Sequence, residues 1–236
     1  MSHEKIRFIL VIIFLLIAFP GKSHAQFASY NLGMWNGTAH YSETGKRGTY
    51  PIKYFGLNML GVAPGDFYMK SNLNYLLNGS RAVQTGDGGV KGVDISLFSF
   101  SYGTAYNNSI MYGIHFDYGW YGPQIPSSEG SYNDLDNGMY FAIGVEGALY
   151  IPYKNLVRTT TFLTVNPIIL TRSDKKVNDG FSIAVESQIQ LSVLHYIGVG
   201  ITPKLEFRNY TGTKWGENVQ IHTFAFSTQL HVFVGF

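Results

Sequence analysis

The stretch VQIHTFAFSTQLHVFVGF, residues 219–236, alternates apolar side chains with small or polar ones. Six of its large apolar side chains share the even positions, and they are Phe224, Phe226, Leu230, Val232, Val234 and Phe236. Small or polar side chains share the odd positions, which include Thr223, Ala225, Ser227, Gln229 and Gly235. Because successive side chains of a β-strand point to opposite faces, the stretch is predicted to form a strand with one apolar and one polar face. Such a strand suits a wall between lipid and a polar lumen.

The same alternation recurs along the rest of the chain. It is clear in residues 109–120, 139–153, 180–193 and 197–208, and weaker in residues 30–41, 52–62, 67–77, 93–102 and 157–171. With the last stretch, these segments predict an all-β fold of about ten antiparallel strands. Eight strands is the alternative, because the two segments nearest the N-terminus alternate poorly and could form an irregular approach or a plug. Between Leu97 and Phe98 the parity switches, as a β-bulge would produce.

Short and longer connections alternate between the predicted strands. Residues 154–155 and 194–196 are predicted to form tight turns, whereas residues 121–137 and 209–218 are polar and are predicted to be loops. This rhythm is typical of an up-and-down barrel that crosses a membrane, with short turns on one side and longer loops on the other. With every short turn on one side of the membrane, both ends of the barrel also fall on that side.

The N-terminal segment has the layout of a cleaved signal peptide. Lys5 and Arg7 precede an unbroken apolar run, residues 8–19, which is too short to cross a bilayer. Small residues follow, and we expect cleavage between Ala25 and Gln26. The prediction is therefore a signal peptide over residues 1–25 and one barrel domain over residues 26–236.

The composition agrees with this prediction. Charged residues make up 14% of the chain and aromatic residues 16%, which is unusual for a soluble domain. The predicted signal peptide carries the whole formal charge of +2, so the mature protein is about neutral and nucleic acid is not an expected partner. The absence of cysteine excludes disulfides and thiolate metal sites. No segment after Gln26 has the apolar length of a transmembrane helix, so a mature chain in a membrane must cross it as a closed barrel.

Aromatic residues near the predicted strand ends are expected to form girdles at the two membrane interfaces, where amphipathic rings are stable. They are Tyr102, Tyr106, Trp120, Tyr121, Tyr150, Tyr153, Tyr196, Phe207 and Tyr210. A ligand platform formed by some of them is the alternative.

Eight ionisable side chains fall on the inward face of the predicted strands: Lys70, His115, Asp117, Glu146, Glu186, Lys204, Glu206 and Arg208. The interior of a barrel of eight to ten strands is only just wide enough for side chains, so opposite charges are expected to meet and fill it. The prediction is a structural salt-bridge plug. A proton or ion path, or a small gated channel, is the alternative use of the same groups.

His115 and Asp117 lie two residues apart on one predicted strand, and therefore on one face. A carboxylate that orients an imidazole suits general-base catalysis, so a membrane-embedded hydrolase or lipid-modifying enzyme is a rival hypothesis. Hydrolysis also needs a nucleophile or a positioned water, and a route for the substrate. The sequence shows neither, so a barrel without catalysis and without a cofactor is expected.

The predicted outer loops carry two further groups of side chains. Basic residues that could contact lipopolysaccharide phosphates are Lys46, Arg47, Arg81, Lys91, Arg172, Lys175, Lys176 and Lys214. Oxygen ligands that could hold Ca²⁺ are Glu129, Asn133, Asp134, Asp136 and Asn137. Their spacing matches no complete calcium loop, so no metal site is predicted.

On its signal peptide, its alternating strands and the final Val232-x-Val234-x-Phe236, the chain resembles bacterial outer-membrane β-barrel proteins over most of its mature length. The resemblance implies that Leu230, Val232, Val234 and Phe236 form the signal read by the barrel-insertion machinery. It also implies a place in the outer membrane, with periplasmic chaperones and that machinery as folding partners, but it implies no substrate. The leading hypothesis is a small monomeric barrel, in contact with outer-membrane lipid and lipopolysaccharide. It would serve envelope integrity, surface interaction or restricted passage of small solutes.

Overall fold

The computed structural model of the chain describes residues 27–43, 46–63, 67–75, 84–85, 91–106, 109–126, 132–133, 138–153, 156–171, 177–194, 196–214 and 217–235. Within these ranges, ten long strands form the barrel: β1 (Phe27–Glu43), β2 (Lys46–Ala63), β3 (Phe67–Tyr75), β5 (Lys91–Tyr106), β6 (Ile110–Pro126), β8 (Gly138–Tyr153), β9 (Val157–Thr171), β10 (Val177–Ser192), β11 (Ile197–Lys214) and β12 (Glu217–Gly235). Two short strands, β4 (Gln84–Thr85) and β7 (Tyr132–Asn133), extend β5 and β6 at one rim. No helix among the described residues is long and apolar enough to span a bilayer.

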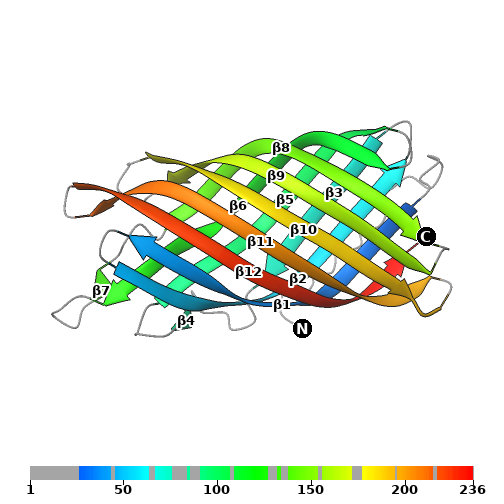
Figure 1. The fold of residues 1–236 in the computed structure, drawn as a ribbon, viewed down its shortest axis with the longest axis horizontal. Coiled ribbons are helices and arrows are strands. Elements are labelled where there is room, and N and C mark those ends of the chain that lie inside the picture. The colour runs from blue at the N-terminus through cyan, green and yellow to red at the C-terminus, as the bar shows by residue number, and fades with distance from the viewer. Residues whose placement is uncertain are drawn as a thin grey trace, which may run out of the picture.

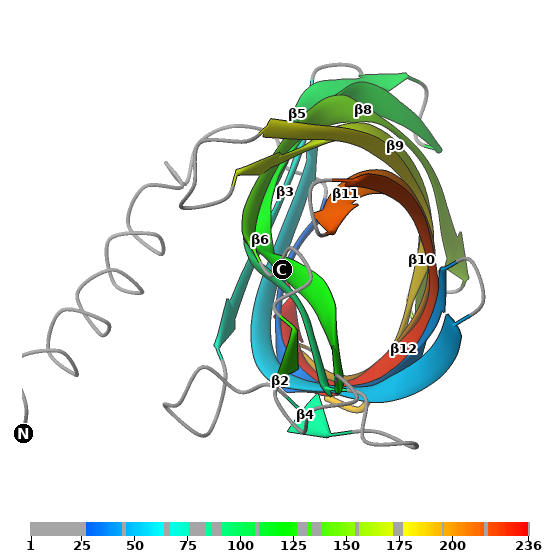
Figure 2. The same cartoon turned by 90° about the vertical axis from the view of Figure 1, so that its left-hand side faces the viewer.

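The ten long strands close into a ring (Figures 1 and 2). Each pairs antiparallel with the next long strand along the chain, and β1 completes the circle by pairing with β12, from Ser29 opposite Gly235 to Glu43 opposite Ile221. Closure pairs the backbone groups that a sheet edge would otherwise expose, as a spanning structure in lipid requires. The predicted up-and-down barrel of ten strands is therefore confirmed, and the alternative of eight is wrong, because β1 and β2 are full strands of the wall.

Side chains alternate between the two surfaces of the wall as predicted. Ile114, Val145 and Leu230 point outward and remain more than 60% exposed. Inward positions on the same strands are buried, as at His115, Glu146 and His231. An apolar outer surface of this extent is unfavourable in water, because its burial is worth about 25 cal/mol per Å². The outer surface is therefore suited to a bilayer.

A register shift interrupts the pairing of β5 with β6 between Ser96 and Phe98. Ile95 and Ser96 are buried before the shift, and Phe98 points outward after it. One extra residue therefore reverses the parity of the strand, which confirms the bulge predicted at Leu97.

Two of the predicted long loops are wrong in extent. β6 continues to Pro126, and β11 and β12 leave only residues 215–216 between them. The alternation fades there because outward positions beyond the apolar band need not be apolar, while backbone pairing continues to Lys214 opposite Glu217. The strands therefore extend past the point at which their sequence pattern ends.

Two apolar clusters lie inside the barrel. The distal cluster, away from the described ends of the chain, contains Trp35, Ala39, Tyr41, Tyr50, Ile52, Tyr54, Ile95, Tyr140, Ile168, Tyr210, Ile221 and Ala225, with Leu97 and Trp120 packed against it. The proximal cluster, near the described ends, contains Leu60, Val62, Tyr68, Ala105, Met111, Ala148 and Phe162, with Tyr150 packed against it. The girdle prediction is therefore wrong for Tyr210 and Tyr150, whose rings face the interior. Tyr102, Tyr106, Tyr196 and Phe207 are exposed on the outer surface.

Candidate functional site

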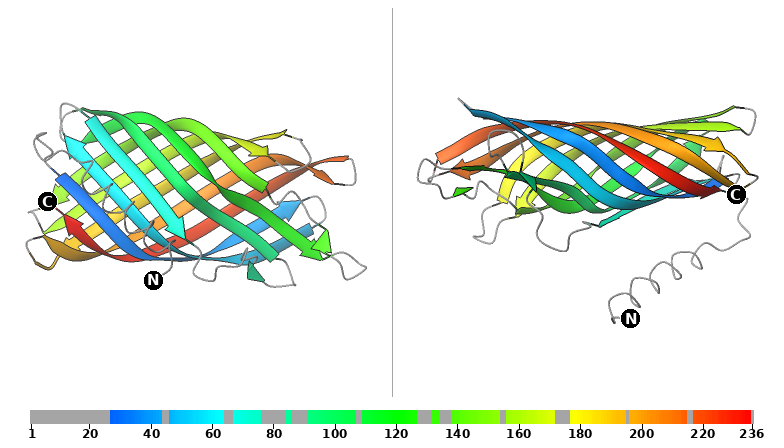
Figure 3. Two further views of the ribbon diagram at one scale, coloured as in Figure 1. Left: turned by 180° about the vertical axis from the view of Figure 1, so that it is seen from behind. Right: turned by 90° about the horizontal axis from the view of Figure 1, so that it is seen from below.

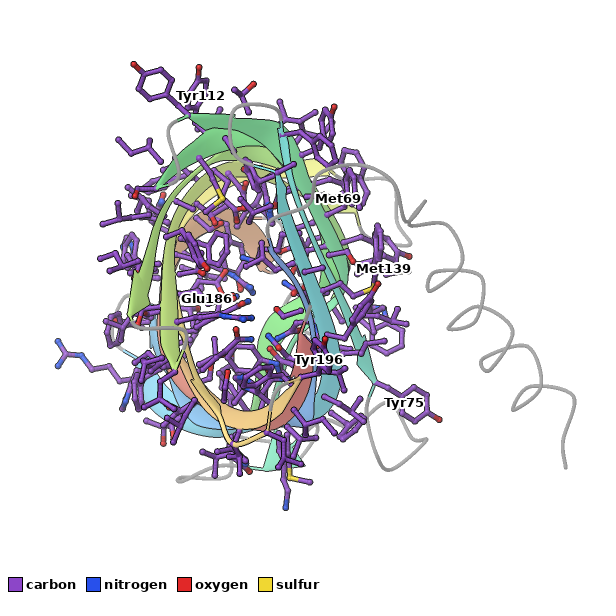
Figure 4. The ribbon with its side chains drawn as sticks, turned by 90° about the vertical axis from the view of Figure 1, so that its right-hand side faces the viewer. Met69, Tyr75, Tyr112, Met139, Glu186 and Tyr196 are labelled. Carbon is purple, nitrogen blue, oxygen red and sulfur yellow. The ribbon has the colours of Figure 1, made fainter. Side chains whose placement is uncertain are left out.

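All eight of the ionisable residues named from the sequence face the interior. Lys70 comes from β3, His115 and Asp117 from β6, Glu146 from β8, Glu186 from β10, and Lys204, Glu206 and Arg208 from β11. Figure 4 shows Glu186 within the ring of strands, whereas Tyr75 and Tyr112 project from its outer surface. Seven of the eight residues are buried, and the Lys204 side chain is 18% exposed. Alternation places these groups on one surface, and closure of the barrel brings them together.

The ionisable side chains form two ionic groups, and Glu146 is the centre of the first, which also contains Lys70, His115 and Glu186. Oε2 of Glu146 lies 3.2 Å from Nζ of Lys70 and 3.6 Å from Nδ1 of His115. Thr164 donates a hydrogen bond to the same oxygen at 3.0 Å, and the Tyr68 hydroxyl donates to Oε1 at 3.5 Å. A buried carboxylate needs such compensation, because removing it from water is costly.

Lys70 joins this group to a second carboxylate. Its Nζ lies 3.5 Å from Glu186, which also accepts a hydrogen bond of 3.2 Å from Gln188. The same nitrogen lies 3.9 Å from the centre of the Phe162 ring, a distance at which a cation is attracted to the ring face. Phe162 belongs to the proximal cluster, so the first ionic group is in direct contact with that cluster.

Glu206 is the centre of the second group. Nε of Arg208 donates to its Oε1 at 2.6 Å, and Nζ of Lys204 lies 2.9 Å from its Oε2. The Arg208 guanidinium lies 5.2 Å from the centre of the Tyr140 ring, in the distal cluster. All three charged residues share the inward parity of β11, so this pairing follows from i, i+2 spacing. The distal cluster borders the second group as the proximal cluster borders the first.

Asp117 has hydroxyl partners. It accepts hydrogen bonds from Ser96 at 2.5 Å and from the Tyr140 hydroxyl at 2.8 Å. Because Tyr140 also lies beside Arg208, Asp117 is tied to the second ionic group through that ring. Although His115 and Asp117 share one face of β6, they are therefore not hydrogen-bond partners of each other.

His115 lies instead between Ser101 and Glu146. The Ser101 hydroxyl is 2.8 Å from Nδ1 of His115, and Glu146 is 3.6 Å from the same nitrogen. In a catalytic triad the base uses one ring nitrogen for the nucleophile and the other for the carboxylate, which this arrangement does not do. Glu146 is also neutralised by Lys70, and all these groups are buried. Ser101, His115, Glu146 and Lys70 therefore form one buried network of hydrogen bonds and ion pairs.

Uncharged polar side chains extend the network, and sequence reasoning did not single them out. Gln190 donates to Asn31 at 2.7 Å and to Ser29 at 3.3 Å, and Asn58 donates to Gln229 at 2.6 Å. The alternation places these side chains on the inward face, and a buried side-chain amide needs hydrogen-bond partners, so the sequence did carry a signal for them. These bonds cross between β10 and β1 and between β2 and β12.

The charged layer is densely filled. A cavity of about 30 Å³ lies between the ionic groups, lined by His115, Asp117, Lys204 and Glu206 among others. A second cavity, of about 10 Å³, lies beside Arg208. Each has room for about one or two water molecules. These two cavities, bordered by the two apolar clusters, are far smaller than an aqueous channel.

The structure describes only part of the other sites predicted from the sequence. Leu230, Val232 and Val234 point outward on β12, and Phe236 lies outside the described residues. Glu129, Asp134, Asp136 and Asn137, and also Arg81, Arg172, Lys175 and Lys176, lie outside them as well. Among the described residues, no group of three histidine, aspartate or glutamate side chains is arranged to hold a metal ion.

No family model matches the chain, and no curated protein sequence matches it. Among solved structures, it is similar to the outer membrane protein OprG from Pseudomonas aeruginosa, with 9% identity, a TM-score of 0.40, and 91% of this chain and 98% of that chain covered. It is similar to the outer membrane protein AlkL, with 14% identity, a TM-score of 0.40, and 92% and 95% covered. It is also similar to the attachment invasion locus protein Ail of Yersinia pestis, with 10% identity, a TM-score of 0.33, and 87% and 97% covered.

Proposed function

We propose that the protein is a sealed, non-catalytic barrel of the outer membrane, whose function lies in its outer surface and loops. The observation that supports this most is the filling of the lumen, where two ionic groups are packed between two apolar clusters. A lumen filled in this way supports envelope integrity or surface interaction better than passage of solutes. The salt-bridge plug is preferred over the gated channel because charged groups that are paired and buried do not offer a hydrated path.

Catalysis is disfavoured by the same geometry. Ser101 and Glu146 contact one nitrogen of His115, and the imidazole is only 6% exposed. A substrate would have to pass one of the two apolar clusters to reach it. The hydrolase hypothesis therefore receives no support from the positions of these groups.

The remaining partners belong to the same proposal. A barrel with an apolar outer face needs lipid around it and assistance to reach the membrane, so we assign it outer-membrane lipid, periplasmic chaperones and the barrel-insertion machinery. Leu230, Val232 and Val234 are exposed on one face of the last strand, where such machinery could bind them before insertion. Residues 1–25 would direct the chain to that route as a cleaved signal peptide, and the inserted barrel would be a monomer.

Single-channel conductance in a planar bilayer tests the sealed lumen. The native protein is expected to be silent, whereas a Lys204→Ala/Arg208→Ala variant is expected to conduct, because it removes two long side chains and leaves Glu206 without its partners. A Lys53→Ala variant is the control, since Lys53 is an exposed cation on the outward face of β2. Stable conductance by the native protein would overturn the proposal in favour of a channel.

A further inference from the structure

A hollow of about 640 Å³ lies on the outer surface at the distal end of the barrel. Its lining comes from β1, β2, β11 and β12, which run side by side in the right-hand view of Figure 3. His40, Arg47 and His222 contribute cationic or N–H donor groups to the hollow, and Phe207 and Phe224 contribute rings. All five side chains are exposed.

The register of the strands arranges these side chains in two adjacent rows. Ser42 lies opposite Arg47 on one side and His222 on the other, which forms a polar row across three strands. One step nearer the middle of the barrel, Phe224 lies opposite both His40 and Phe207. The rings of Phe207 and His222 stack with centroids 6.3 Å apart and planes 22° apart. Polar donors therefore lie immediately beyond an aromatic surface.

The hollow also lies where the outer surface changes character. On β1 and β2 the outward positions near it are polar, including Asn36, Thr38 and Lys53. On β11 and β12 the outward positions beside it remain apolar, as at Leu205 and Phe226. The hollow therefore lies between an apolar surface on one side and a polar surface on the other, so a ligand bound there can contact both.

The charge of the lining favours an anion. None of the residues that line the hollow, all of them in described strands, is an aspartate or glutamate. A guanidinium such as that of Arg47 binds phosphate through two parallel hydrogen bonds, and an imidazole N–H donates to phosphate oxygens in either charge state. Arg47 and the two histidines therefore supply donors, and no fixed negative charge among these lining residues opposes an anion.

We propose that this hollow binds the phosphate group of a phosphorylated glycolipid of the outer leaflet, with Arg47 and His222 on the phosphate and an acyl chain against Phe207 and Phe224. The outer leaflet is chosen because the hollow lies at the end opposite the described chain ends, where barrels of this type carry their longer loops. The inference rests on the proposed membrane location. It deepens the proposed function, because it identifies a lipid partner for the outer surface.

Native mass spectrometry of the refolded full-length chain in zwitterionic detergent tests the site, with diphosphorylated lipid A as the probe. The native protein is expected to bind one lipid A in preference to its dephosphorylated form. Arg47→Gln and His222→Gln are each expected to weaken binding about tenfold, which corresponds to one charge-assisted hydrogen bond. Lys53→Gln, which removes an outward cation farther along the same strand, is expected to bind like the native protein.

Three results would overturn the site. They are unchanged binding by the Arg47→Gln/His222→Gln variant, equal binding of dephosphorylated lipid A, and displacement of lipid A by equimolar inorganic phosphate, which would indicate a site for a soluble anion. A heat-dependent gel shift confirms that each variant is folded before binding is compared. Failure of lipid binding leaves the conductance test unaffected, so the failure of this site and the failure of the sealed barrel are distinguishable.

Discussion

Nζ of Lys70 lies 3.2 Å from Oε2 of Glu146, and the two side chains are 3% and 0% exposed. Lys70 belongs to β3 and Glu146 to β8, which are not neighbours in the sheet. The contact therefore crosses the interior and links separate parts of the wall. It is a buried ion pair whose partners are each held by further contacts, with Glu186 and Phe162 on one side and Thr164 on the other.

Lys70→Met is expected to destabilise the barrel by about 3–5 kcal/mol, because it leaves Glu146 buried without its cation. The free energy of unfolding from lipid vesicles in urea, followed by the heat-dependent gel shift, measures the effect. Adding Glu146→Gln to Lys70→Met removes the unpaired charge and is expected to restore most of the loss. Equal destabilisation in the single and double variants would show that the two residues are not coupled.

Trp35 is expected to contribute through packing alone. It lies in the distal cluster with its ring 5.9 Å from that of Tyr54, and its Nε1 makes no hydrogen bond within the described part of the chain. Trp35→Ala is therefore expected to cost about 3–5 kcal/mol in unfolding free energy. Trp35→Phe is expected to cost less than half as much, since it keeps a ring and loses no bond. A Phe variant as unstable as the Ala variant would contradict this account.

The four histidines of the described wall are expected to differ in their reaction with diethylpyrocarbonate. His40 and His222 are exposed on the outer surface, whereas His115 and His231 are only 6% and 5% exposed in the interior. In the folded protein, peptide mass spectrometry should find modification at His40 and His222 but not at His115 and His231. The urea-unfolded chain, in which all four should react, is the control. Modification of His115 in the folded barrel would mean that solutes enter the lumen.

Two glycines face His231 from opposite sides, and they are expected to tolerate alanine differently. Gly33 on β1 and Gly200 on β11 both lie opposite His231 in the sheet. A Cβ at Gly33 would collide with the carbonyl oxygen of Leu230, whereas a Cβ at Gly200 would collide first with the His231 ring. Each alanine variant is expected to cost about 1–3 kcal/mol in unfolding free energy.

Adding His231→Ala should therefore restore part of the stability that Gly200→Ala loses. The relief is only partial, because the carbonyl oxygen of Ile189 also lies 2.7 Å from a Cβ at Gly200. The same substitution should leave the cost of Gly33→Ala unchanged, because backbone cannot be removed by a side-chain substitution. Unfolding free energies of the two double variants, each compared with His231→Ala alone, provide the measurement. Equal relief at both glycines would contradict the difference.

The faces of the wall could be predicted from the sequence residue by residue. On β10 the alternation predicts that Ile183 and Val185 face outward and that Ser182 and Glu186 face inward, and the structure places them so. The bulge at Leu97 was also visible, because one extra residue reverses the parity. The N-terminal strands were less certain, since the outward positions of β1 beyond Met34 are polar and the apolar signal is lost there.

The sequence by itself determined that the chain builds a two-faced wall, and which side chains face inward, because alternation in a strand is a local property with a period of two. Only the tertiary structure decided which inward groups meet. Glu146 pairs with Lys70, and Asp117 binds Ser96 and Tyr140, through contacts that depend on how ten strands close and stagger. Closure of the barrel also brings Tyr210 and Trp35 together in the distal cluster. Contacts across the lumen depend on closure, which no single strand encodes, so the pairing of these groups became visible only in three dimensions.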